Sequence, residues 1–183
     1  PVTFVGHPLV EQPLIDGNRD RFLAQYNIPD TATVLTILPG SRESEIKKLL
    51  PIFQDAVSIL SKKIKGLVTV IPTVREVAKN VHAGIENWPC PVKVVQGQSD
   101  KMDAYAASTV ALASSGTIAL ELAQAQLPMV IAYKLSRISG WIARRLLTVK
   151  YACMINILND TETVPECLQE KCTPKVLAEE LLK

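Results

Sequence analysis

The chain has 183 residues, 48% of them apolar, and a net charge of +2, so it can build a folded core and is not expected to be disordered. The small net charge argues against nucleic acid as a bulk partner, and no apolar run reaches the roughly 18–20 residues of a membrane span. None of the four cysteines forms a Cys-x-x-Cys pair, so free thiols are expected and a metal site is not. We expect one domain over residues 1–183, cut from a longer protein because a strand-like segment begins abruptly at residue 2.

Short apolar runs typical of buried strands alternate with helical patterns along the chain. Strands are expected at residues 34–38, 67–71, 92–95, 110–113 and 129–133, with a weaker one at 151–155. Helices are expected at 46–64, with a break or new first turn at Pro51, and at 74–85, 100–107, 117–125, 138–147 and 173–183. This alternation indicates an α/β fold, a doubly wound, mostly parallel Rossmann-like sheet covered on both faces.

Two loops each follow a strand-like run and open a helical pattern. Apart from one arginine, their residues are glycines or carry hydroxyls: Gly40, Ser41 and Arg42 in the first loop, and Ser115, Gly116 and Thr117 in the second. Such loops leave backbone N–H groups bare at a helix N-terminus, which suits phosphate, and an arginine adds a forked cation. Each loop can also be read as a plain turn and helix cap, and the arginine as a solvated surface residue.

The expected topology favours the phosphate interpretation. In the common doubly wound order, strands one and four are neighbours, and their following loops open the crevice where ligands bind. The runs 34–38 and 110–113 are the first and fourth strands, so the two loops are expected side by side. Together they predict a site for a phosphorylated, nucleotide-linked ligand.

One acidic residue extends this prediction. Glu121 follows Thr117 by four residues, so both share a helix face, where a carboxylate can accept hydrogen bonds from ribose hydroxyls. The alternative is a satisfied glutamate near a helix start. The Gly-x-Gly-x-x-Gly fingerprint is absent, which counts against NAD or FAD. There is no Gly-x-Ser-x-Gly or His-Glu-x-x-His motif either, so no catalytic residue is assigned in this chain.

A basic segment follows the second loop. Between residues 122 and 159 there are five lysines and arginines and no carboxylate side chain. Cations interleaved with apolar residues can lie on an anionic membrane surface, and the candidate contacts are Arg137, Trp141, Arg144 and Arg145. An ordinary helix packed on the sheet, with its cations in water, is the competing interpretation.

Several motifs, taken in order, resemble one known family. They are Gly6-His7-Pro8-Leu9, Leu38-Pro39-Gly40-Ser41-Arg42 with Glu45-Ile46, Ser115-Gly116-Thr117 with Leu120-Glu121, Pro128-Met129-Val130, Ala132-Tyr133-Lys134, Asn156-Ile157-Leu158, and Val164-Pro165-Glu166 with Leu168-Gln169. This order and spacing is similar to that of lipid A disaccharide synthases, over nearly the whole chain. No single motif is specific, but the combination is. Met154-Ile155 stands where the family often has Leu-Pro, which puts the local turn in doubt.

The resemblance implies the C-terminal, nucleotide-sugar-binding half of a GT-B glycosyltransferase, without its N-terminal domain. The family moves 2,3-diacylglucosamine from UDP to 2,3-diacylglucosamine 1-phosphate (lipid X), forming the lipid A disaccharide and UDP, with no metal or organic cofactor. It works in the cytoplasm, peripherally on the anionic inner face of the bacterial inner membrane. The resemblance implies UDP contacts by the two loops and by Glu121, Asn156 and Gln169. It places the general base in the absent half.

Other functions remain open at this stage. A UDP-sugar 2-epimerase, or another GT-B transferase such as the one that adds N-acetylglucosamine in peptidoglycan synthesis, would share the crevice. A non-catalytic nucleotide-binding or membrane-docking module is a third reading, and a homodimer is left open. Because this chain is expected to be half of a two-domain cleft, it is expected to bind UDP weakly and to transfer no sugar.

Overall fold

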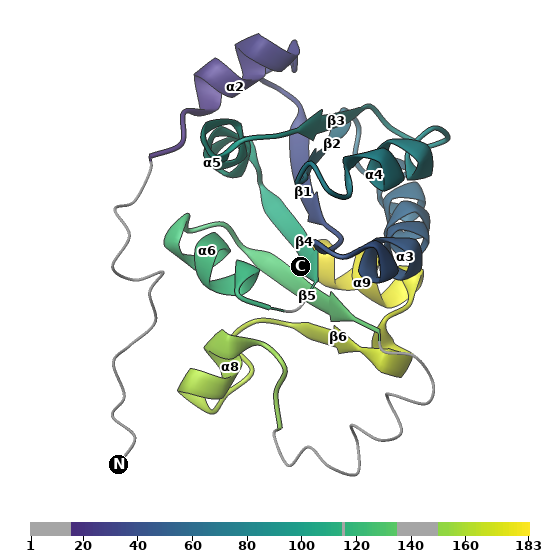
Figure 1. Cartoon of the computed structure of the whole chain (residues 1–183), viewed down its shortest axis with the longest axis vertical. Helices are drawn as coiled ribbons and strands as arrows, with labels where there is room; N and C mark the ends of the chain where they lie inside the picture. Colours follow the sequence, from purple (N-terminus) through teal and green to yellow (C-terminus); the bar gives the residue numbers. More distant parts are fainter. Residues whose placement is uncertain (1–15, 115, 135–149) are drawn as a thin grey trace.

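In the computed structural model, residues 16–114, 116–134 and 150–183 are described, and they form a six-stranded parallel sheet between two helical layers (Figure 1). The strands lie in the order β3-β2-β1-β4-β5-β6, and every neighbouring pair is parallel. Their bounds are β1 Thr33–Leu38, β2 Leu67–Pro72, β3 Val92–Val95, β4 Val110–Ser114, β5 Met129–Tyr133 and β6 Glu166–Leu168. The doubly wound parallel sheet predicted from the sequence is confirmed.

Helices cover both faces of this sheet. One layer holds α3 (Glu43–Ser61), α4 (Ala78–Gly84) and α9 (Pro174–Leu181); the other holds α2 (Arg19–Tyr26), α5 (Gln98–Ala107) and α6 (Ile118–Gln124), with α8 (Met154–Asn159) near β6 (Figure 1). A 3-10 turn, Gln169–Lys171, links β6 to α9. Strand β1 shows why both layers form: Val34 packs with α2 and α5, while Leu35 and Ile37 pack with α3 and α9. Alternate side chains of a strand point to opposite faces, so a continuous apolar strand needs cover on both.

The last strand lies later in the chain than we predicted from the sequence. Residues 151–155 are not a strand, because α8 begins at Met154 and β5 pairs instead with the three-residue strand β6. The backbone N–H groups of Ala152 and Cys153 donate to the Glu166 carboxylate at 2.8–3.2 Å, so this segment is held by a side chain and not by a strand ladder. The apolar run that suggested a strand supplies the buried Cys153 and the start of α8.

Two helical expectations also change. Helix α3 continues through Pro51, so the expected break is wrong. The proline removes one backbone hydrogen bond, but the fully buried Leu49 and Phe53 on either side hold the helix against the sheet. The expected helix 138–147 lies outside the described residues, and α2 was not predicted. The remaining expected helices are present with shifted ends.

Candidate functional site

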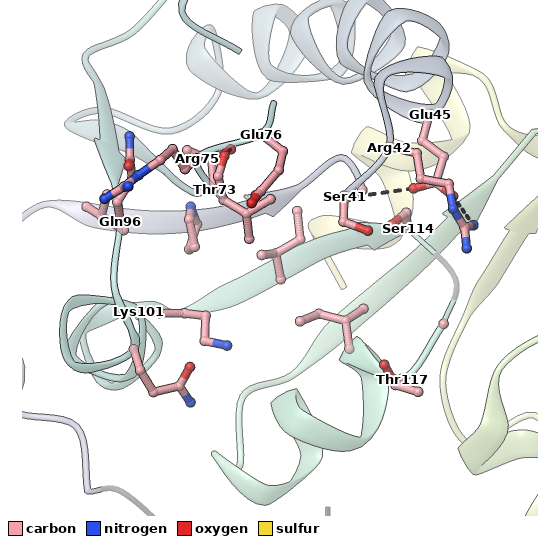
Figure 2. Close-up of a pocket in the computed structure, with 18 of the residues that line it drawn as sticks. Ser41, Arg42, Glu45, Thr73, Arg75, Glu76, Gln96, Lys101, Ser114 and Thr117 are labelled. Atoms are coloured by element: carbon pink, nitrogen blue, oxygen red, sulfur yellow. Dashed lines mark hydrogen bonds and ion pairs between the residues drawn. The ribbon is translucent and has the colours of Figure 1, made fainter. Parts of the chain in front are cut away.

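A pocket opens at the edge of the sheet where β1, β2, β3 and β4 end, and the segment after each strand contributes to it. The cavity has a volume of about 960 Å3, and Figure 2 shows most of its lining side chains. Because β1 pairs with β4, the two loops predicted from their chemistry line the same pocket: Gly40, Ser41 and Arg42 after β1, and Gly116 and Thr117 after β4. The predicted juxtaposition of these loops is therefore confirmed.

A carboxylate from its own helix holds the first loop. Gly40 has a φ of +117°, a conformation that disfavours any side chain, and a Cβ placed there would lie 2.8 Å from Glu45 Cβ, so Glu45 would have to shift. Glu45 Oε2 accepts from the backbone N–H of Ser41 at 3.2 Å, and Glu45 Oε1 accepts from Arg42 Nη1 at 3.1 Å (Figure 2). The donors of this loop are thus already directed at an anion, here an internal carboxylate.

The second loop is more open. Gly116 has a φ of +146°, a conformation that glycine favours, and no atom would obstruct a Cβ there. Thr117 precedes α6 as its N-cap residue and makes no side-chain capping bond, while its side chain lines the pocket. Ser115, the third predicted member, lies outside the described residues. This loop therefore presents backbone and a hydroxyl to the cavity without an internal anion.

Glu121 is turned toward a partner that the sequence did not suggest. Its carboxylate forms an ion pair with Lys101 of α5, and Lys101, not Glu121, lines the pocket. Tyr105, one turn after Lys101 in α5, is buried. Burial, and then the charge of Glu121, raise the pKa of the Tyr105 hydroxyl. The predicted ribose acceptor is therefore paired with a lysine.

Two predicted UDP contacts lie away from the pocket. Asn156 is fully buried: its Nδ2 donates to the Val164 carbonyl and to Glu166 Oε1, both at 2.8 Å, and its Oδ1 accepts from the Val164 N–H at 2.8 Å. Both amide hydrogens are used, so the side chain has no donor left for UDP, and the structure gives Asn156 the structural role of tying α8 to β6. Gln169 follows β6 with a φ of +49° and does not line the pocket.

Reasoning from the sequence missed the contributions of the other two strands. The segment after β2 supplies Thr73, Arg75 and Glu76, and the segment after β3 supplies Gln96 and, one helical turn into α5, Lys101 (Figure 2). The available signal was positional, because carboxyl ends of parallel strands share one sheet edge. The segment after β2 has no glycine, and Gly97 after β3 stands alone between two glutamines, so neither was singled out as a phosphate loop.

The pocket is suited to an anion. Its charged lining residues are the cations Arg42, Arg75 and Lys101 and the carboxylates Glu45 and Glu76. Cations and backbone N–H groups fixed before a ligand arrives can stabilise phosphate charge, and they can stabilise charge that develops on a leaving phosphate. The arrangement therefore fits binding, or departure, of a phosphorylated group.

The remaining predictions concern metal binding and contact with a membrane. Among residues 16–114, 116–134 and 150–183, no cluster of three or more histidine, cysteine or acidic side chains could hold a metal ion. Within the same ranges, the helices are too short or too polar to cross a bilayer. The candidate membrane contacts Arg137, Trp141, Arg144 and Arg145 lie outside the described residues.

Comparison with protein families and curated sequences gives a consistent result. The profile of a family described as lipid-A-disaccharide synthetase matches residues 1–183. The lipid-A-disaccharide synthase of Rhodospirillum centenum is 49% identical over 178 residues, which are 97% of this chain and 44% of that protein. The chain thus spans less than half the length of this curated relative.

Solved structures share the fold at low sequence identity. The Escherichia coli ADP-heptose lipopolysaccharide heptosyltransferase II matches with a TM-score of 0.63 at 12% identity, over 93% of this chain and 51% of that one. A UDP-GlcNAc 2-epimerase from Neisseria meningitidis, bound to UDP-GlcNAc, matches with a TM-score of 0.50 at 17% identity, over 89% of this chain and 48% of that one. At these identities the likeness concerns the fold alone, a Rossmann-like domain of the kind found in GT-B proteins.

Proposed function

The chain belongs to the lipid-A-disaccharide synthetase family, and from this membership we propose that its pocket holds the UDP part of a nucleotide-sugar donor. The whole enzyme transfers 2,3-diacylglucosamine from UDP to lipid X, giving the lipid A disaccharide and UDP. The observation that carries this proposal is the meeting of the β1 and β4 loops in one cavity with three cations. The N. meningitidis epimerase supports it, because a related fold there holds UDP-GlcNAc.

The proposed chemistry uses these groups to stabilise the leaving group. The acceptor hydroxyl oxygen bonds to C1 of the donor sugar while the bond from C1 to the β-phosphate oxygen breaks, and UDP leaves with the electron pair. Negative charge grows on the diphosphate, where the backbone N–H groups after β1 and β4 and the Arg42 guanidinium can stabilise it. The acceptor proton needs a general base, which we place in the part of the enzyme that lies beyond this chain.

A two-stage experiment tests the proposal. Titration of the purified 183-residue chain with UDP should show weak but saturable binding, because half of a two-domain cleft makes only part of the contacts. The same chain should form no disaccharide from the acylated donor and lipid X, whereas the whole enzyme should. Absence of UDP binding would contradict the pocket assignment. Disaccharide formation by the chain alone would contradict placing the base and acceptor site elsewhere.

The whole enzyme can also separate the alternatives. Preference for a water-soluble UDP-sugar over the acylated donor, or conversion of UDP-GlcNAc to its epimer, would favour another GT-B activity. UDP binding without turnover of any donor would favour a non-catalytic module. The 49% identity to a lipid-A-disaccharide synthase supports the acylated donor.

We further propose that the enzyme works on the cytoplasmic face of the inner membrane and contacts it through the basic segment. Both proposed substrates carry acyl chains, and each cation near an anionic surface contributes about 1 kcal/mol. Arg144→Glu combined with Arg145→Glu should therefore reduce co-sedimentation with anionic vesicles, most at low salt, and leave UDP affinity unchanged. Lys62→Glu with Lys63→Glu, an exposed pair after α3, is the matched control. If the parent and the Arg144/Arg145 variant sediment equally, the proposed membrane contact is wrong, and the alternative of an ordinary helix with its cations in water is favoured.

A further inference from the structure

A carboxylate engages the donors of the loop that follows β1. Glu45 Oε2 accepts from the backbone N–H of Ser41 at 3.2 Å, and Glu45 Oε1 accepts from Arg42 Nη1 at 3.1 Å. Figure 2 draws both contacts, and all three residues line the pocket. The proposed function assigns the same two kinds of donor, the backbone N–H groups of this loop and the Arg42 guanidinium, to the phosphates of the ligand. The carboxylate of Glu45 and a bound phosphate would therefore use the same partners.

The contact that Glu45 makes differs from an ordinary helix cap. Helix α3 begins at Glu43 with Arg42 as its N-cap residue, so Glu45 is at the third helical position. In a capping box, a glutamate at this position accepts from the N–H of the N-cap residue itself. Glu45 reaches past that residue to the N–H of Ser41, which belongs to the loop. The carboxylate thus lies where the loop directs its donors at an anion.

The loop keeps this carboxylate close. The Glu45 side chain is 16% exposed, whereas that of Arg42 is 77% exposed. Gly40 leaves the room that Glu45 occupies, because a Cβ on Gly40 would lie 2.8 Å from Glu45 Cβ. The ion pair with Arg42 also offsets the cost of partly burying the carboxylate. Glu45 is therefore a built part of the first loop and not a solvated surface residue.

A phosphate has to displace Glu45 to use these donors. The Ser41 N–H has one hydrogen to donate, and a carboxylate and a phosphate in the same place repel each other. An acceptor attached to the adjoining helix turn is present at high effective concentration, so a free anion from solution competes poorly with it. A nucleotide gains further contacts elsewhere in the pocket, which lets its phosphates displace the carboxylate. The competition therefore separates anchored phosphates from free ones.

We propose that Glu45 is a specificity-determining residue that competes with phosphate for Ser41 and Arg42, yields to the phosphates of a nucleoside diphosphate, and excludes free inorganic phosphate. This inference rests on the proposed function, because it takes a nucleoside diphosphate as the ligand. It accounts for an acidic side chain placed directly against the cation of a phosphate-binding loop.

The test uses UDP, uridine and inorganic phosphate with the full 183-residue chain. Glu45→Gln removes the charge and keeps the length of the side chain. It should strengthen UDP binding about tenfold, as expected for the loss of one nearby like charge, and change uridine binding less than about twofold. Inorganic phosphate should compete with UDP at a concentration about tenfold lower in this variant than in the parent.

Two further variants complete the comparison. The glutamine amide oxygen can still accept from Ser41, whereas Glu45→Ala removes the acceptor and should also strengthen UDP binding. Glu43→Gln is the matched control, because it removes a carboxylate from the same helix turn that pairs with Lys47 and does not line the pocket. The control should leave UDP binding and phosphate competition unchanged. Unchanged uridine binding shows that the pocket of each variant is intact.

Three results would contradict these proposals, and they are distinguishable. Weaker UDP binding in both Glu45 variants, with uridine unchanged, would overturn the inference and mean that Glu45 orients Arg42. UDP and phosphate affinities equal to those of the parent, or a loss shared by UDP and uridine with a lowered melting temperature, would overturn it and leave Glu45 as a structural cap. Absence of UDP binding by the parent and by every variant would overturn the proposed function itself.

Discussion

Replacing Arg42 by alanine should weaken UDP binding by roughly tenfold to a hundredfold, because one charge-assisted contact to phosphate contributes about 1.5–3 kcal/mol. The guanidinium lies at the pocket, its side chain is 77% exposed, and it forms an ion pair with Glu45 in the first turn of the helix that follows the loop. Stability should change little, since an exposed side chain of this kind contributes within about 0.5 kcal/mol. Calorimetric titration with UDP, alongside urea unfolding, measures both quantities.

Arg42→Lys is the matched control for this prediction. It keeps the charge but not the planar fork, so it should recover only part of the lost affinity. Full recovery would mean that Arg42 acts as a point charge and not through a two-pronged contact. An unchanged UDP affinity in Arg42→Ala would remove this residue from the site.

The candidate site was predictable where local chemistry carried the signal. Gly40 and Arg42 stand just after a buried strand, and the strand order expected of a doubly wound sheet places them beside Gly116 and Thr117, as the pairing of β1 with β4 confirms. Lys101 was not predictable in this way. Its contact with Glu121 spans two helices, and spacing along one helix could suggest only the face that Glu121 shares with Thr117.

Asn156 shows the same limit, because it was predicted to contact UDP but does not line the pocket. Asn156 matched a motif, but motifs do not say which way a side chain points. Its amide is consumed by Val164 and Glu166, residues eight and ten positions later, whose contribution depends on how the short strand β6 adds to the sheet. A three-residue strand has too little sequence pattern to be found without its partner.

The fold was predictable for the strands that are buried on both faces and much less so for α2. That helix has a polar sequence with only Phe22 and Leu23 buried, so its apolar pattern is weak. Its position depends on a distant residue: Asp103 of α5 accepts from the Asn18 N–H at 2.7 Å and from two nitrogens of Arg21 at 2.6 and 2.7 Å. A contact across more than eighty residues leaves no trace in local spacing.

Replacing Asp103 by asparagine should lower the free energy of unfolding by about 1.5–3 kcal/mol, the range for hydrogen bonds to a charged group. Asp103 is 1% exposed, so the polar group that replaces it stays buried with fewer partners, whereas Arg21 is half exposed and can be rehydrated. Urea unfolding at neutral pH measures the loss. Asp55→Asn, at an exposed position of α3, is the matched control and should change stability by less than about 0.5 kcal/mol.

The pH dependence of this loss identifies the charge as its cause. The hydrogen bond from Arg21 holds the pKa of Asp103 below its usual range. A carboxyl whose pKa is depressed in the folded state adds stability above its unfolded pKa, about 3.9, and that contribution disappears as the pH falls through the folded pKa. The gap in unfolding free energy between parent and Asp103→Asn should therefore stay constant near neutral pH and narrow below about pH 4. A gap that persists undiminished in acid would mean that shape and packing at Asp103, and not its charge, hold α2 against α5.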